Sequence, residues 1–128
     1  CRAFPFFPYI DREGRFIGLS YYWIFEDRCW VISNLQVVDM QFVGEFVAAY
    51  DLLIARDKQE YEGFRDHSVS MRRVFSRWNR FIPLIGRDGG YFKVMPKTGR
   101  VLPCDPARYP THAPYKEKVR SAAAAPRP

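Results

Sequence analysis

The stretch DMQFVGEFVAAYDLLIARDKQEYEG, from Asp39 to Gly63, predicts a long amphipathic helix around which the rest of the chain packs. Its apolar side chains recur at spacings of three and four residues, which places them on one face of a helix. These residues are Val43, Phe46, Val47, Tyr50, Leu53 and Ile54. Asp39 is a candidate N-cap, and Gly63 can adopt the left-handed conformation that ends a helix.

A second helix is predicted over residues 70–81, again from apolar positions three and four residues apart. These positions are Met71, Val74, Phe75, Trp78 and Phe81 or Ile82. Ser68 or Ser70 can cap its start, and Pro83 can end it. The opposite face of this helix carries Arg73, Arg77 and Arg80, and Arg72 lies next to that face. Such a face either binds phosphates or carboxylates of a partner or is simply solvated, and the sequence leaves both interpretations open.

Two β-hairpins are predicted, one on each side of the helices. Residues 15–25 alternate in the way that a half-buried strand does, and residues 29–33 supply the strand that pairs with them. Residues 91–95 and 100–102 form the second pair around a tight turn. The sequence therefore predicts an α+β domain over residues 10–102, with a small antiparallel sheet of two hairpins and two helices on one face.

Both ends of the chain are predicted to lie outside this domain. Residues 1–9 contain two prolines and indicate an extended arm, which either folds over its own core or lies along a partner. Residues 103–128 are rich in proline and indicate an extended tail. The side chains expected to contact a partner, from the two ends and the arginine face, are Phe4, Phe6, Phe7, Tyr9, Arg72, Arg73, Arg77, Arg80, Tyr109 and Tyr115.

The composition favours a folded domain that binds something acidic. The chain has 128 residues, of which 48% are hydrophobic and 17% aromatic, and a formal charge of +6. Aromatic side chains in this number suggest a face that packs on another protein, beyond what one small core needs. The positive charge favours an acidic protein surface, RNA or anionic lipid as the partner. No apolar run approaches the ~20 residues of a membrane span, so no transmembrane segment is expected.

The sequence offers no constellation that names a reaction, a metal or a cofactor. Cys1, Cys29 and Cys104 form no CxxC pair and are expected to be free thiols in a reducing compartment. His67 and His112 lie in polar segments and are expected to be exposed, which disfavours catalysis by a cysteine–histidine pair. Cys104 and His112 alone are too few for a zinc site. We therefore expect a protein that is not an enzyme.

Three short motifs resemble the central part of SUKH domains, the family of the yeast cell-wall regulator and of bacterial immunity proteins. They are Trp78-Asn79-Arg80-Phe81-Ile82-Pro83-Leu84, Gly89-Gly90-Tyr91-Phe92 and Thr98-Gly99-Arg100-Val101. In that family a strand with Ile-Pro precedes a Gly-Gly turn and a strand that ends in Gly-x-Val. The resemblance implies a protein-binding module. The N-terminal helices of the family have no counterpart here, and the basic charge departs from the acidic surface typical of its toxin-neutralising members.

These observations favour a non-catalytic accessory subunit of a large assembly, which docks on neighbouring protein subunits through its extended ends. Small basic proteins with extended arms are common in mitochondrial respiratory-chain complexes and mitochondrial ribosomes, so we expect a mitochondrial location, in the matrix or at the periphery of the inner membrane. The chain begins at Cys1 and not at Met, which fits a processed protein or a fragment. A SUKH-like protein-binding module and an RNA-contacting ribosomal protein are the alternatives.

Overall fold

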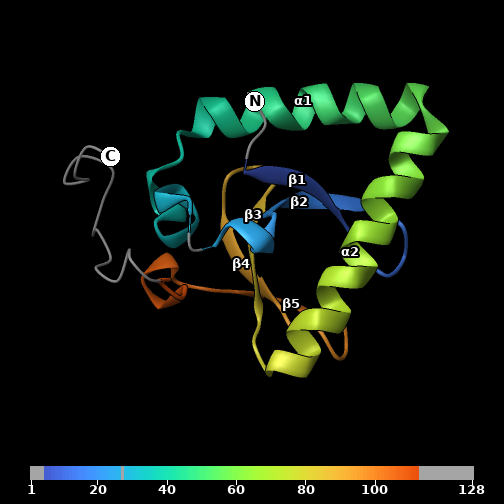
Figure 1. Ribbon diagram of the computed structural model, residues 1–128. Helices are drawn as coiled ribbons and strands as arrows, with labels where there is room; N and C mark the ends of the chain where they lie inside the picture. The colour runs from blue at the N-terminus through green and yellow to red at the C-terminus, as the bar shows by residue number, and fades with distance from the viewer. Residues whose placement is uncertain (1–4, 27, 113–128) are drawn as a thin grey trace.

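A five-stranded antiparallel sheet forms the centre of the molecule. The computed structural model describes residues 5–26 and 28–112. The strands lie in the order β1-β2-β3-β4-β5, with the bounds β1 Phe6–Ile10, β2 Phe16–Tyr21, β3 Ile82–Gly86, β4 Tyr91–Val94 and β5 Val101–Pro103. Between β2 and β3 the chain forms α1, Met40–Arg56, and α2, Lys58–Trp78. In Figure 1 α1 lies across the top and α2 runs down the right side, and the predicted small α+β fold is confirmed.

Strand β1 is formed by residues that the sequence had suggested as an extended arm. It pairs antiparallel with β2, so that Phe6 lies opposite Tyr21 and Pro8 opposite Leu19. Proline is tolerated in β1 because this is an edge strand, where one side of the backbone needs no ladder partner. From Phe6 onward, the prediction of an arm outside the domain is therefore corrected: these residues complete the domain's own sheet. Residues 1–4 lie outside the described part of the chain.

The outer edge of β1 is covered by side chains of the two helices. Tyr50 on α1 donates its hydroxyl to the carbonyl of Phe6 at 3.2 Å. Ser68 on α2 accepts the N–H of Ile10 at 2.9 Å, and Arg72 donates to the carbonyl of the same residue at 2.9 Å. Main-chain groups that an edge strand would leave unpaired are thus bonded within the domain, which blocks the edge against another chain.

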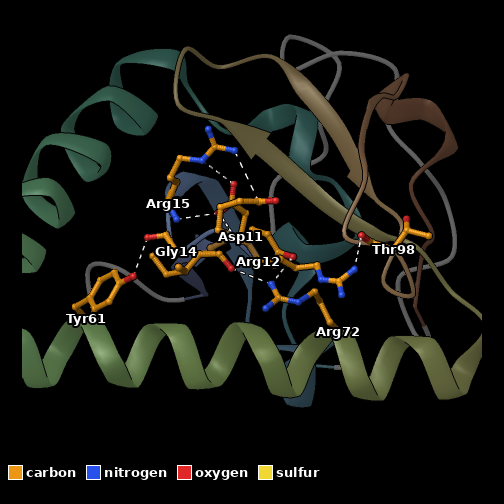
Figure 2. A network of polar contacts seen from close by, with 10 residues as sticks. Asp11, Arg12, Gly14, Arg15, Tyr61, Arg72 and Thr98 are labelled. Carbon is orange, nitrogen blue, oxygen red and sulfur yellow. Dashed lines mark hydrogen bonds and ion pairs between the residues drawn. The ribbon is translucent and has the colours of Figure 1, made fainter.

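Arg72 is buried, with 9% of its surface exposed, although the sequence pattern indicated a position on or beside a solvated face. Besides its bond to the sheet backbone, its guanidinium donates to the hydroxyl of Tyr9 at 2.8 Å and lies over that ring at 5.5 Å. Figure 2 shows it reaching from α2 toward the β1–β2 turn. Burial raises the pKa of Tyr9, which keeps this hydroxyl neutral. Arg72 therefore holds α2 to β1 and does not take part in an exposed arginine face.

The first helix ends before Asp57, where α2 begins, and not at Gly63 as predicted. The predicted cap at Asp39 is confirmed, since its carboxylate accepts the N–H of Gln41 at 2.7 Å. Asp57 caps α2 in the same way and accepts from Gln59 and Glu60. Gly63 lies inside α2, which ends instead at Asn79 in the left-handed conformation, with φ of 56°. An aspartate cap inside the periodic stretch decided the boundary, because it satisfies the first N–H groups of a new helix.

Two further segments differ from the predicted strands. Ile82–Gly86 is the central strand β3, where the periodicity predicted the end of the second helix at Pro83. A strand at Ile82-Pro83 was implied only by the SUKH resemblance. Residues 29–33, predicted as a strand, contain instead the short 3₁₀ helix Trp30–Ser33. Strand β1 occupies the position beside β2 that these residues would have needed. The segment from β2 to α1 contains two more 3₁₀ turns, Trp23–Phe25 and Leu35–Val37.

The C-terminal hairpin agrees with the prediction. Strands β4 and β5 pair around a turn at residues 96–99, with Lys93 opposite Leu102 and Val94 opposite Val101. Within the described residues, neither helix has the length and apolar character needed to cross a membrane.

Replacing Arg72 by methionine is expected to destabilise the protein by about 3 kcal/mol, because the Ile10 carbonyl and the Tyr9 hydroxyl lose a buried charged donor. The matched variant Arg73→Met changes an exposed neighbour and is expected to alter stability by less than about 0.5 kcal/mol. Urea unfolding followed by circular dichroism measures both. Equal effects of the two substitutions would contradict the assigned role of Arg72.

Candidate functional site

A cavity of about 560 Å³ lies between the C-terminal end of α2 and the β4–β5 hairpin. Its volume falls within the range typical of ligand pockets. The lining residues are Ser76, Asn79, Arg80, Phe81, Lys93, Met95, Pro96, Lys97, Thr98, Arg100 and Leu102. Phe81, Met95, Pro96 and Leu102 give it apolar walls. A side chain inserted here would therefore leave water on several sides.

Basic side chains surround these walls, and none of the lining residues is acidic. Lys93 extends from β4 on the same face as Leu102 of β5, since the two residues lie opposite each other. Lys97 lies in the turn between the strands, and Arg100 follows it. Among the described residues, no ion pair within 4.0 Å joins these three cations to a carboxylate. The cavity therefore presents positive charge that the described part of the chain does not neutralise.

Arg80 also lines the cavity, but its charge is already paired. Its guanidinium binds both carboxylate oxygens of Glu26, at 3.0 and 3.2 Å, and the two side chains are only 28% and 13% exposed. It lies over the rings of Phe75 at 4.7 Å and Trp78 at 5.2 Å. The hydroxyl of Tyr21 donates to Glu26 at 3.1 Å, and burial raises the pKa of Tyr21 well above its ordinary value. Arg80 therefore acts as a wall of the cavity and a fixed link to the segment after β2.

The turn that carries the cations is held by Arg12 from the β1–β2 turn. Arg12 donates to the carbonyl of Thr98 at 2.6 Å, as Figure 2 shows. Gly99 follows in the left-handed conformation, with φ of 76°, and the side chain of Arg12 packs where a Cβ of residue 99 would lie. Only glycine fits this backbone and this contact together. The positions of Lys97 and Arg100 thus depend on a residue far away in the sequence.

The β1–β2 turn is itself rigidly bonded. Asp11 accepts the N–H groups of Glu13 at 3.0 Å and Arg15 at 2.8 Å. Tyr61 on α2 donates its hydroxyl to the carbonyl of Gly14 at 2.8 Å, and Figure 2 shows these contacts side by side. The turn is therefore fastened to α2 and can serve as a support for the hairpin beyond it.

The structure does not bring the predicted partner-binding residues together. Phe6, Phe7 and Tyr9 are at most 2% exposed and belong to the core, which corrects their assignment as docking residues. The expected tail is corrected as well where it is described: Tyr109 is buried, and its hydroxyl donates to the carbonyls of Leu84 at 3.1 Å and Phe92 at 2.6 Å. These aromatic rings fill the sheet's own core because burying them there stabilises the fold.

Of the remaining predicted residues, Arg73 and Arg77 are exposed on α2. Phe4 and Tyr115 lie outside the described residues. Sequence reasoning did not select Lys93, Lys97 or Arg100. The signal was present, because the predicted hairpin over residues 91–102 already implied that these positions lie around one tight turn.

Most aromatic residues in the described part of the chain are half-buried or buried. The large apolar side chains that stay exposed are Ile24, Met40, Phe42, Leu52, Val69, Trp78, Met95 and Val101. Phe42 and Leu52 lie on α1, of which only Val43 and Val47 are fully buried. The helix α1 is thus apolar on its outer side as well as toward the sheet. Met95 and Val101 adjoin the basic cavity.

Neither histidine is exposed in the way predicted from sequence. His67 is half-buried against the ring of Phe7 at 4.3 Å and stacks on Trp23 at 4.8 Å. His112 is 14% exposed, with Nδ1 3.5 Å from the carboxylate of Glu26. The side chains of Cys29 and Cys104 are half-buried thiols. Within residues 5–26 and 28–112, no cluster of three or more His, Cys, Asp or Glu could hold a metal ion.

Comparison with protein-family models, with curated proteins and with solved structures gives no match for this chain. The SUKH resemblance therefore stays a prediction. The cavity and the charges around it are therefore the features from which a function can be proposed.

Gly99→Ala is expected to destabilise the protein by about 1–2 kcal/mol, since alanine disfavours the left-handed backbone and its Cβ would meet Arg12. Gly63→Ala is the matched control, because its added Cβ meets nothing within 4 Å inside α2. This control is expected to stabilise by about 0.5–1 kcal/mol. Chemical unfolding of both variants gives the comparison, and stabilisation by Gly99→Ala would contradict the described turn.

Protonation of His67 is expected to destabilise the fold, because burial lowers its pKa below the ordinary value of 6.5. The unfolded chain then binds more protons than the folded one just below pH 6.5, so stability falls as the pH drops through that value. In His67→Phe this part of the pH dependence should disappear. Unfolding free energies measured between pH 7 and pH 5 test it, and an unchanged slope in the variant would assign the effect to another group.

Proposed function

We propose that this protein is a non-catalytic accessory subunit of a larger assembly, and that it binds an acidic segment of a neighbouring protein in the basic cavity. One observation carries the proposal: an apolar-walled cavity is bordered by Lys93, Lys97 and Arg100, with no acidic residue in its lining. A partner with an apolar side chain and adjoining carboxylates matches both features.

The energies favour a combined contact over either part alone. Burying one large apolar side chain contributes about 1.5–3 kcal/mol, and each exposed ion pair adds about 0.2–1 kcal/mol. Neither term alone gives stable docking after the loss of translational and rotational freedom. A segment that supplies both binds more tightly than a segment that supplies only one of them, and the charges also steer it toward the cavity.

A protein partner fits the cavity better than RNA does. Phe81 is the aromatic ring in the lining, and Lys93 already lies over it at 5.6 Å. The cavity therefore lacks a free aromatic platform on which a base could stack, which is the usual source of affinity for single-stranded RNA. RNA contact through the cations alone remains the competing outcome of the experiment below.

A SUKH-like protein-binding module is the second candidate. It is favoured by one observation, because two of the motifs that resemble the family supply cavity residues: Asn79, Arg80 and Phe81 from the first, and Thr98 and Arg100 from the last. Both candidates share the same protein-binding cavity. The expected mitochondrial location, and a respiratory-chain complex or ribosome as the assembly, stay predictions from the sequence.

The double variant Lys97→Glu/Arg100→Glu is expected to release the chain from its assembly. The control Lys58→Glu/Arg65→Glu changes the charge by the same amount at exposed positions of α2 and should leave the assembly intact. Each tagged form is produced in cells that make the chain naturally, and mild lysates are separated by size. The wild type and the control should elute with a large complex, whereas the double variant should elute alone.

Two results would contradict the proposal. Wild-type chain that elutes alone would exclude a stable accessory subunit. Release of the wild type by nuclease would identify nucleic acid as the partner, and the RNA-contacting alternative would then replace this one.

A further inference from the structure

The two edges of the sheet differ in how their backbone groups are used. At β1 the helices cover the outer edge, as described above. At β5 the main-chain groups that face β4 are hydrogen-bonded. The carbonyl of Arg100 accepts the N–H of Met95 at 2.8 Å, and the N–H of Cys104 donates to the carbonyl of Tyr91 at 3.1 Å. Because antiparallel pairing alternates, the residues between them, Val101 and Pro103, direct their main-chain groups away from β4. No further strand pairs with β5 within the described residues.

This edge borders the basic cavity. Leu102 lies on β5 and lines the cavity, while Val101 is 37% exposed on the adjacent position. A strand laid along β5 would project every second side chain over the cavity face, since side chains alternate along a strand. Arg100 and Lys97 lie at one end of that face. The position of the cavity therefore suits an extended ligand better than a helix.

We propose that the acidic segment binds as an added strand on β5, with one apolar side chain in the cavity and acidic side chains two positions away against Lys97 and Arg100. This inference rests on the proposed function and specifies the conformation of the partner. Addition of a strand to an exposed edge is a general mode of peptide recognition, in which the backbone gives affinity and alternate side chains give specificity.

The backbone available at β5 sets the strength and length of the pairing. Val101 offers one N–H and one carbonyl, and Pro103 offers a carbonyl but no N–H. The added strand can thus form three main-chain hydrogen bonds before proline ends the pairing. Such a short ladder cannot hold an arbitrary peptide, so the side chains over the cavity decide which segment binds.

The test uses the full chain and two synthetic peptides with a fluorescent label. The first alternates Thr and Glu around one central Leu, so that Glu and Leu share a face in a strand. The second has the same composition in permuted order and lacks that alternation. Anisotropy titrations should show that the alternating peptide binds about tenfold more tightly, because only its order places Leu and Glu on the same face of a strand.

A second readout reports the backbone contact directly. Amide hydrogen exchange at Val101, followed by NMR, should slow at least about tenfold when the alternating peptide is bound, because its N–H becomes bonded. The variant Lys97→Gln/Arg100→Gln should weaken both peptides, since it removes charge and leaves the edge unchanged. The control Lys58→Gln/Arg65→Gln should weaken neither.

The outcomes separate this inference from the proposed function. Equal binding of the two peptides, or unchanged exchange at Val101, overturns the added strand; if that binding still depends on Lys97 and Arg100, the proposed function stands. If neither peptide binds, the inference is also overturned. The elution experiment then decides the proposed function independently. Tighter binding of a single-stranded oligonucleotide at the same salt concentration would overturn both.

Discussion

The contact between Arg72 and the backbone of β1 is the constraint on which the rest of the structure depends. A guanidinium inside a protein is strongly unfavourable unless its donors are bonded, and here the carbonyl of Ile10 and the hydroxyl of Tyr9 accept them. Those acceptors exist only when β1 is in place beside α2. The position of α2 in turn sets where its C-terminal end meets the β4–β5 hairpin, and so places one wall of the cavity.

The sheet is therefore closed by its helices on one side and accessible on the other. Tyr50, Ser68 and Arg72 satisfy the outer groups of β1, whereas the outer groups of β5 point away from the sheet. The cations gather at this second edge, on a turn that Arg12 fixes from the opposite end of the sheet. The same network that stabilises the fold thus keeps the basic residues of the cavity in position.

Local signals in the sequence were sufficient for some elements and misleading for others. Asp39 as a cap and the β4–β5 hairpin could be predicted, because capping and tight turns depend on a few neighbouring residues. Strand β1 could not, since Pro5 and Pro8 suggested an arm and only distant helix residues make the edge position favourable. The burial of Arg72 and the pairing of Arg80 with Glu26 also depend on partners far away in the chain. The cavity could not be predicted from the sequence for the same reason, because its lining comes from three separate elements.

The edge of β1 is covered by residues that the ribosome adds to the chain much later than β1 itself. The ribosome makes β1 and β2 first, but Arg72 follows Ile10 by 62 positions and Ser68 follows it by 58. During that interval the nascent hairpin exposes Phe6 and Phe7 beside an unpaired backbone edge, which is the kind of surface that self-associates or recruits chaperones. The two helices therefore shield the β1–β2 hairpin from self-association. Until α2 has been synthesised, the backbone edge of β1 lacks the hydrogen bonds of Ser68 and Arg72, and the nascent chain is most prone to aggregate.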